Sequence, residues 1–180
     1  MAEPARKPKA NHNKKPAASV SKFEPTHASE ISRIQDQLRR ALEGDAWHGP
    51  AVLELLNDTP VDLAPAKPLD QAHSIWEIAL HIAAWHGAVV ERLNGKTVQL
   101  EQEDDWPRVA DFSESAWRET IHHVEQSFDR LDQAIGKLSD EDLNGPVPGK
   151  KYNVYFMLHG VIQHSLYHAG QIALLKRSSR

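Results

Sequence analysis

Histidine stands out in this chain of 180 residues, which contains 11 histidines and no cysteine. Two of them, His164 and His168, lie four residues apart in the tract H-S-L-Y-H. If this tract is helical, both rings project from one face of the helix, one turn apart, where imidazole nitrogens can hold a single metal ion. The alternative is a pair of buried histidines that are satisfied by hydrogen bonds and bind no metal.

A third ligand must come from another part of the chain, and His81 is the best candidate. It lies at the edge of the apolar stripe of the segment 74–93, from which its ring can reach into a helical core or a crevice beside it. Taken alone, it is equally a boundary histidine that makes one polar contact. Three histidines on core-facing sides of two helices would each be costly to desolvate, and a shared metal ion removes that cost. We therefore predict a metal site formed by His81, His164 and His168.

Three neutral imidazoles leave at least one coordination position open, which is typical of catalytic rather than structural metal sites. A divalent ion in such a site lowers the pKa of a bound thiol or water. All-nitrogen ligation suits zinc, nickel, iron or copper. Because the chain has no cysteine, a sulfur nucleophile would have to be a cosubstrate.

Two further residues are candidate catalytic groups. Gln171 follows His168 by three residues, so it shares nearly the same helix face and can hydrogen-bond a metal-bound ligand or fix a histidine tautomer. An amide that bridges two helices is the alternative interpretation. His48 lies in A-W-H-G-P, where a bend can aim its ring inward, or where it can bond the exposed backbone of the bend.

The elements that must position these residues are helices. Apolar residues recur every three or four positions in five segments, and no alternation typical of strands is present. Ser74 and Glu77 form a capping box at the start of one of these segments. We predict an all-α fold, a four-helix bundle with a broken first helix. The predicted helices span residues 29–42 and 51–57 (the broken first helix), 74–93, 113–138 and 153–176.

Residues 1–27 differ in composition from the rest of the chain. They contain four prolines and six basic against two acidic residues, so we predict a disordered basic tail followed by the bundle over residues 28–180. Of the 21 basic and 25 acidic residues in the chain, 15 and 23 remain in the predicted bundle, which makes nucleic acid an unfavourable partner. We find no secretory signal and no membrane-spanning segment, and therefore expect a cytoplasmic protein.

Two segments resemble the DinB/YfiT-like superfamily of metalloenzymes. They are A-H-S-I-W-E-I-A-L-H-I-A-A-W, residues 72–85, and H-G-V-I-Q-H-S-L-Y-H-A-G-Q-I-A-L-L-K-R, residues 159–177. The resemblance extends over residues 30–177 and includes A-W-H-G-P. It implies a bundle whose helices do not simply alternate in direction, and a divalent metal held by His81, His164 and His168.

The resemblance also implies classes of activity. Some members of the superfamily transfer low-molecular-weight thiols, such as bacillithiol or mycothiol, onto electrophiles, and members often pair as dimers. We therefore expect a thiol-dependent S-transferase that acts on a small electrophile, and a homodimer. The alternatives are a metal-dependent hydrolase and a non-catalytic bundle in which the metal fastens two helices together.

Overall fold

The structure is a computed structural model that describes residues 28–69 and 71–178. Apart from one isolated bridge between Pro146 and Asn153, the regular structure in these ranges is helical. The all-α prediction is confirmed. The predicted tail, residues 1–27, lies outside the described residues. The elements are α1 (Glu30–Leu42), α2 (Val52–Asn57), α3 (Ile75–Leu93), α4 (Gln102–Asp105), α5 (Glu114–Ile135), a 3-10 turn η1 (Asp142–Asn144) and α6 (Val154–Ser178).

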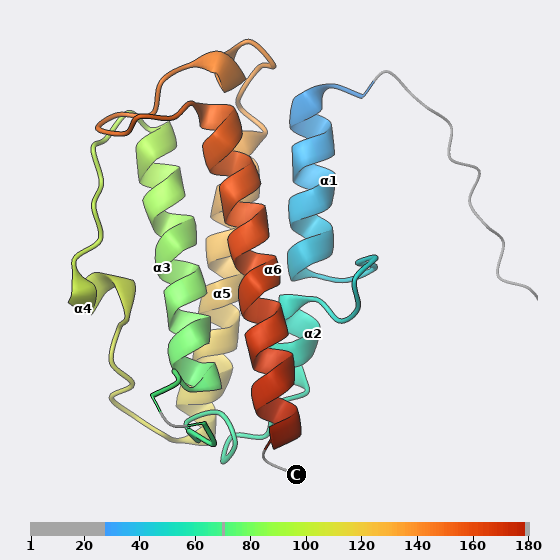
Figure 1. Cartoon of the computed structure of the whole chain (residues 1–180), viewed down its shortest axis with the longest axis vertical. Coiled ribbons are helices and arrows are strands. Elements are labelled where there is room, and N and C mark those ends of the chain that lie inside the picture. Colours follow the sequence, from blue (N-terminus) through green and yellow to red (C-terminus); the bar gives the residue numbers. More distant parts are fainter. Residues whose placement is uncertain (1–27, 70, 179–180) are drawn as a thin grey trace, which may run out of the picture.

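Four columns of helix form the bundle, and α1 and α2 together make one of them (Figure 1). The chain breaks between these two helices at a bend where Asp45 has a φ of 56° and Gly49 a φ of 130°. Pro50 follows the bend, and α2 then continues along the same column with buried leucines facing α5 and α6. The predicted broken first helix is confirmed.

The helices α3 and α5 run in the same direction, while α1 and α6 run in the opposite one (Figure 1). Two parallel neighbours need a long connection, and residues 94–113 return along the outside of α3 to supply it. The connection also contains the short helix α4, which was not among the predicted helices. The path of the connection matters for function, because it carries Asp105 and Trp106 back to the middle of α3.

Local sequence explains where the long helices begin. The Ser74 hydroxyl accepts a hydrogen bond from the Glu77 backbone N–H at 3.2 Å, and the Glu77 carboxylate accepts one from the Ser74 N–H at 2.7 Å. Ser29 and Ser113 cap α1 and α5 in the same way through one bond each. These bonds satisfy donors that the first helical turn leaves unpaired.

The apolar stripes meet in one core between the columns. Leu38, Ile82, Leu131 and Ile172, one from each column, are fully buried. The Trp76 indole N–H donates to the Thr120 hydroxyl at 2.9 Å, which ties α3 to α5 inside the core. Within residues 28–69 and 71–178, no helix is both long enough and apolar enough to cross a lipid bilayer.

Candidate metal centre

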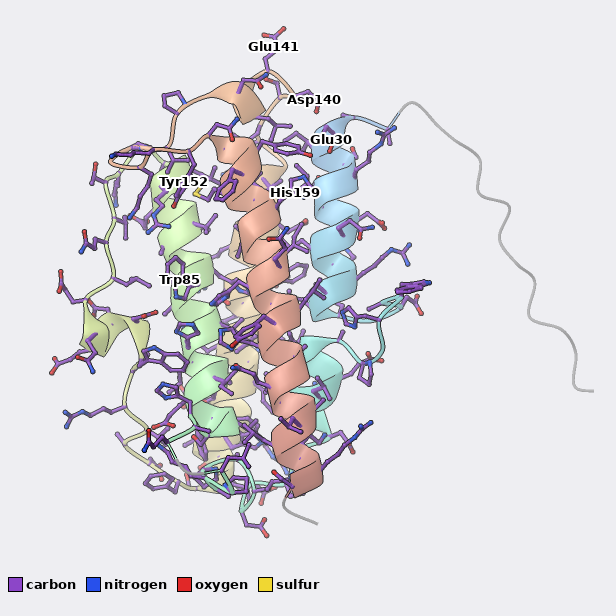
Figure 2. The ribbon with its side chains drawn as sticks, viewed as in Figure 1. Glu30, Trp85, Asp140, Glu141, Tyr152 and His159 are labelled. Atoms are coloured by element: carbon purple, nitrogen blue, oxygen red, sulfur yellow. The ribbon has the colours of Figure 1, made fainter. Side chains whose placement is uncertain are left out.

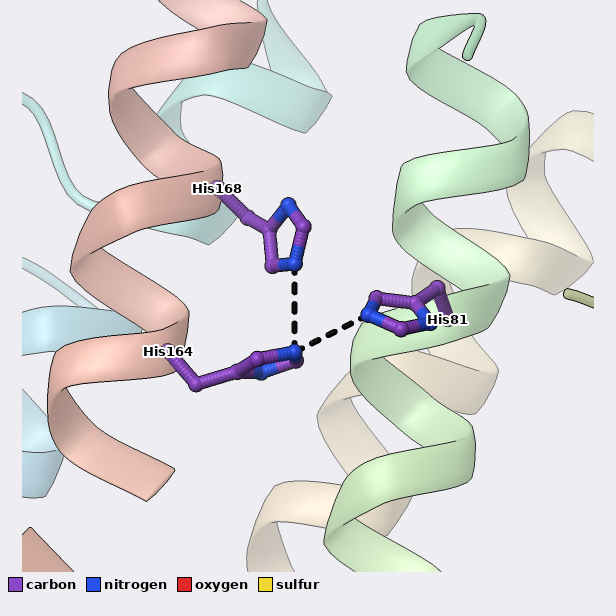
Figure 3. A group of neighbouring side chains, drawn as sticks. All are labelled: His81, His164 and His168. Atoms are coloured by element: carbon purple, nitrogen blue, oxygen red, sulfur yellow. Dashed lines mark hydrogen bonds between the residues drawn. The ribbon is translucent and has the colours of Figure 1, made fainter. Parts of the chain in front are cut away.

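Three imidazole rings meet between α3 and α6. Nε2 of His164 lies 2.9 Å from Nε2 of His81 and 3.1 Å from Nε2 of His168. The potential ligand atoms of the three rings all lie within 4.8 Å of one another. Figure 3 shows the three rings turned toward a common point, one from α3 and two from successive turns of α6. The structure thus brings together the three histidines that the sequence singled out.

The opposite ring nitrogens determine which tautomers are present. Nδ1 of His81 lies 2.7 Å from the Asp105 backbone oxygen and 3.0 Å from its carboxylate Oδ1. Nδ1 of His168 lies 2.6 Å from Oε1 of Gln171. Both neighbours are acceptors, so Nδ1 of each ring carries the hydrogen. The Nε2 atoms of His81 and His168 therefore present lone pairs to the common point, as metal-bound histidines do.

A bound cation would satisfy both of these lone pairs at once. A single hydrogen on Nε2 of His164 can serve only one of the two short contacts. Burial is the main reason that the pKa of His164 falls to about 3 and that of His168 to about 4, and burial also lowers the pKa of His81. The rings therefore take up no second proton at neutral pH and stay neutral, which is the form that binds metals.

The spacing of the nitrogens fits a first-row divalent ion. Two nitrogens that each lie about 2.0–2.1 Å from one ion are about 2.9 Å apart at a right angle and about 3.4 Å apart at a tetrahedral angle. The observed separations of 2.9 and 3.1 Å match the lower part of this range. The potential ligand atoms of His81, His164 and His168 all lie within 4.8 Å of one another, so the three rings can hold one ion together once they draw closer around it.

Aromatic rings and Asp105 support His81 from the outside. Trp106 stacks on His81 with ring centroids 3.8 Å apart, and His73 stacks on the other face of Trp106 at 3.5 Å. The indole N–H of Trp85, labelled on α3 in Figure 2, donates to Asp105 Oδ1 at 2.7 Å. Our sequence analysis assigned no role at the site to Asp105 or Trp106. The available signal was the acidic run before Trp106, which lies between two predicted helices.

A cavity of about 380 Å³ lies on the Gln171 side of His168. Its described walls carry no aspartate, glutamate, lysine or arginine. His164 itself is half-buried, so the cluster is not sealed from solvent. The cavity is lined by Leu69, Gln71, Ala72, His73, Ile78, Trp106, Tyr167, His168, Gln171, Leu174 and Leu175.

The two predicted catalytic groups have different positions. Gln171 contacts His168, which is the tautomer-fixing arrangement that we considered. His48 is exposed in the bend after α1 and lines a separate cavity with Ile162 and Leu166 of α6. Those two residues are each two positions from His164, so their side of α6 is opposite to the cluster. The expectation that the bend aims His48 into the site is therefore wrong, because the bend turns outward.

The remaining histidines of the described residues, and Glu77, lie outside the cluster. Glu77 is held by the cap of α3 and by Lys67, whose Nζ lies 2.9 Å away, so it does not orient His81. The His159 ring faces α1, with Nε2 4.0 Å from the Glu30 carboxylate (Figure 2). His86 is fully buried and follows His81 by five residues, which places it on another side of α3.

A family model described as the DinB superfamily matches residues 46–172. This chain belongs to the DinB superfamily. The matched range contains α2 to α5 and most of α6, including all three clustered histidines. No curated protein and no solved structure matches the chain. Membership in the DinB superfamily and the three-histidine cluster together fit a metal-binding helical protein.

Proposed function

We propose that this DinB-superfamily chain is an enzyme that uses a divalent ion of zinc, nickel or iron to transfer a low-molecular-weight thiol onto a small electrophile. One observation carries the proposal: three Nε2 atoms converge while the Nδ1 atoms of His81 and His168 are held by acceptors. Such a set of neutral ligands leaves the positive charge of a bound ion available to a substrate.

The chain's own groups have defined roles in this proposal. Asp105 and Gln171 hold the outer nitrogens of two ligands, and this fixes the direction in which Nε2 of each ring points. Trp106 covers one face of His81 and keeps water from it. When bound, the ion would supply the positive charge that favours a thiolate over a thiol at neutral pH.

The reaction itself balances with an external thiol. A bond forms between the thiol sulfur and an electrophilic carbon, the leaving group departs with its electron pair, and the thiol proton passes to solvent. The absence of cysteine from the chain supports a cosubstrate as the source of sulfur. No described residue at the cluster offers a sulfur atom.

The cavity beside Gln171 supports an uncharged, largely apolar electrophile. Ile78, Trp106, Leu174 and Leu175 provide apolar walls, and no described lining residue carries a full charge that would pair with an anion or a cation. Pockets of this kind bind the apolar body of a ligand and orient it with a few polar groups. The Gln171 side-chain amide and the Tyr167 hydroxyl are such groups.

The hydrolase alternative has less support. It needs a general base near the ion, and both His48 and Glu77 lie outside the cluster. Asp105 is already engaged by His81 and Trp85. The non-catalytic alternative is disfavoured by the half-buried His164 and by the adjoining cavity, which a purely structural site does not need.

Turnover measurements test the proposal. Metal-loaded protein is assayed with a panel of small thiols and with neutral and anionic electrophiles of equal size. We expect metal-dependent turnover that favours the neutral electrophile and is lost in His164→Ala. The matched control is His122→Ala, which removes an exposed histidine of α5. Turnover that survives metal removal contradicts the proposal, ester hydrolysis without thiol indicates the hydrolase, and binding of metal without turnover indicates the structural role.

A further inference from the structure

His86 is a fully buried histidine that none of the roles above uses. Its Nδ1 lies 2.9 Å from the Ser127 hydroxyl oxygen on α5. That hydroxyl donates its own hydrogen to the Val124 backbone oxygen at 2.7 Å, so it must accept from His86. Nδ1 of His86 therefore carries the hydrogen, and Nε2 is an acceptor. This Nε2 atom is buried and has no hydrogen-bond partner among the described residues.

His164 also has one buried ring nitrogen without a hydrogen-bond partner among the described residues. Its Nε2 faces His81 and His168, so in a metal-bound cluster the hydrogen of the neutral ring is on Nδ1. Nδ1 of His164 is also buried without a hydrogen-bond partner among the described residues. Native proteins seldom leave such atoms unsatisfied, and a buried water commonly joins them where no direct bond forms. Nδ1 of His164 is a donor and Nε2 of His86 is an acceptor, so one bridging water would satisfy both atoms.

The ring of His164 lies against the part of α3 that carries His86. Trp85, the residue before His86, has its ring centroid 5.5 Å from that of His164. Repulsion from a charge on His86 also contributes to the lowered pKa of His164, after burial and the other two ligands. His86 follows His81 on α3 by five residues, so it faces a different side of that helix. There it contacts α5 through Ser127.

We propose that His86 is a positioning residue that accepts the Nδ1–H of His164 through one buried water molecule. The inference rests on the metal site of the proposed function. It gives His164 the outer support that Asp105 gives His81 and that Gln171 gives His168. The link continues through Ser127 into α5, so a helix that supplies no ligand would still fix the direction of one.

Two variants of His86 test this link. His86→Phe removes the acceptor and keeps a ring, while His86→Gln keeps a polar side chain that can still accept from the water. Cobalt(II) affinity is measured by chelator competition, together with the visible spectrum of bound cobalt. We expect affinity to fall about 10- to 100-fold in His86→Phe, with a changed spectrum, and to recover at least in part in His86→Gln.

Controls separate positioning from general loosening of the core. Trp76→Phe removes another buried hydrogen bond of α3, to Thr120, and should leave cobalt affinity and spectrum unchanged. Ser127→Ala releases the His86 tautomer without altering the histidine, and should weaken cobalt binding by a smaller factor. It serves as the test variant if His86→Phe does not fold.

Nitrogen-15 NMR of metal-free protein distinguishes this inference from the proposed function. In that form the His164 hydrogen faces His81 and His168 from Nε2, and the buried water donates one hydrogen to Nδ1 of His164 and one to Nε2 of His86. We expect the His164 ring signals to shift in His86→Phe, or in Ser127→Ala if it replaces that variant. If wild-type protein binds no cobalt and these signals still shift, the metal site is wrong while the His86–His164 link stands. Unchanged His164 signals, or cobalt affinity and spectrum equal to wild type in the variant used, overturn the link.

Discussion

Gln171 offers the most graded test of the site, because two substitutions should change metal affinity in opposite directions. Its Oε1 lies 2.6 Å from Nδ1 of His168, so it holds the hydrogen of a ring that would donate electron density to an ion. Gln171→Leu removes this acceptor with little change in side-chain length. Gln171→Glu replaces it with an anionic acceptor, which makes the imidazole a better electron donor.

The expected magnitude follows from the bond that is lost. A hydrogen bond to a charged or strongly polarised group contributes about 1.5–3 kcal/mol. Since about 1.4 kcal/mol corresponds to a tenfold change in affinity, Gln171→Leu should weaken metal binding about 10- to 100-fold. Gln171→Glu should bind the metal more tightly than wild type. Gln171 is only partly buried, so solvent can accommodate the added charge.

Competition with a chromophoric chelator measures the zinc affinity of both Gln171 variants. Gln163 provides matched controls, because it lies on the same helix with its side chain exposed. Gln163→Leu and Gln163→Glu should both bind zinc as wild type does. Circular dichroism verifies that all four variants keep their helical content. If Gln171→Leu retains wild-type affinity, the reasoning about the outer nitrogens is refuted.

Three other predictions concern the surroundings of the site. His48→Ala should leave zinc affinity and turnover unchanged, since His48 lies in the exposed bend after α1; a tenfold loss of either would contradict the placement. Leu174→Lys, at the exposed edge of the cavity, should lower turnover of a neutral electrophile without changing zinc affinity, whereas Phe156→Lys, which lines a different cavity, should change neither. The metal-free protein should lose stability as the pH falls below 6.5. Burial lowers the pKa of His86 and of His164 to about 3 in the folded protein. Between these pH values the unfolded chain therefore binds protons on both histidines that the folded chain does not bind. Urea midpoints at pH 7, 5 and 4 measure this loss, and equal midpoints would contradict it.

Much of the fold could be predicted because its signals are local. The capping box of Ser74 and Glu77 lies within four residues, and both of its bonds are present. The apolar stripes repeat within single helices, and the same stripes form the core. The proline and glycine residues around the bend at Gly49 predicted the break between α1 and α2.

The histidine cluster could be predicted only in part from spacing. His164 and His168 share a helix face whatever the rest of the chain does, so their proximity follows from helix geometry. His81 joins them because α3 and α6 pack together, and the family resemblance supplied this contact in advance. Its membership of the cluster therefore depended on more than periodicity.

The residues that sequence reasoning missed depend on tertiary structure. Asp105 and Trp106 reach His81 because the connection between α3 and α5 returns along α3, and no local signal specifies that path. His86 follows His81 by five residues, so a single apolar stripe along α3 would place the two on different sides of the helix. This helix packs against both α5 and α6, so two of its sides are buried. The direction of His48 depends on a bend with positive φ at Asp45, which composition does not predict.

Metal content tests the central claim most directly. Protein purified without an affinity tag is analysed for its elements and then titrated with zinc, alongside His81→Ala. The structure predicts one divalent ion per chain in wild-type protein and none in His81→Ala, with helical content equal in both. Wild-type protein that neither contains nor binds a divalent ion, or a His81→Ala variant that keeps its ion, would contradict the convergence of three histidines on one metal.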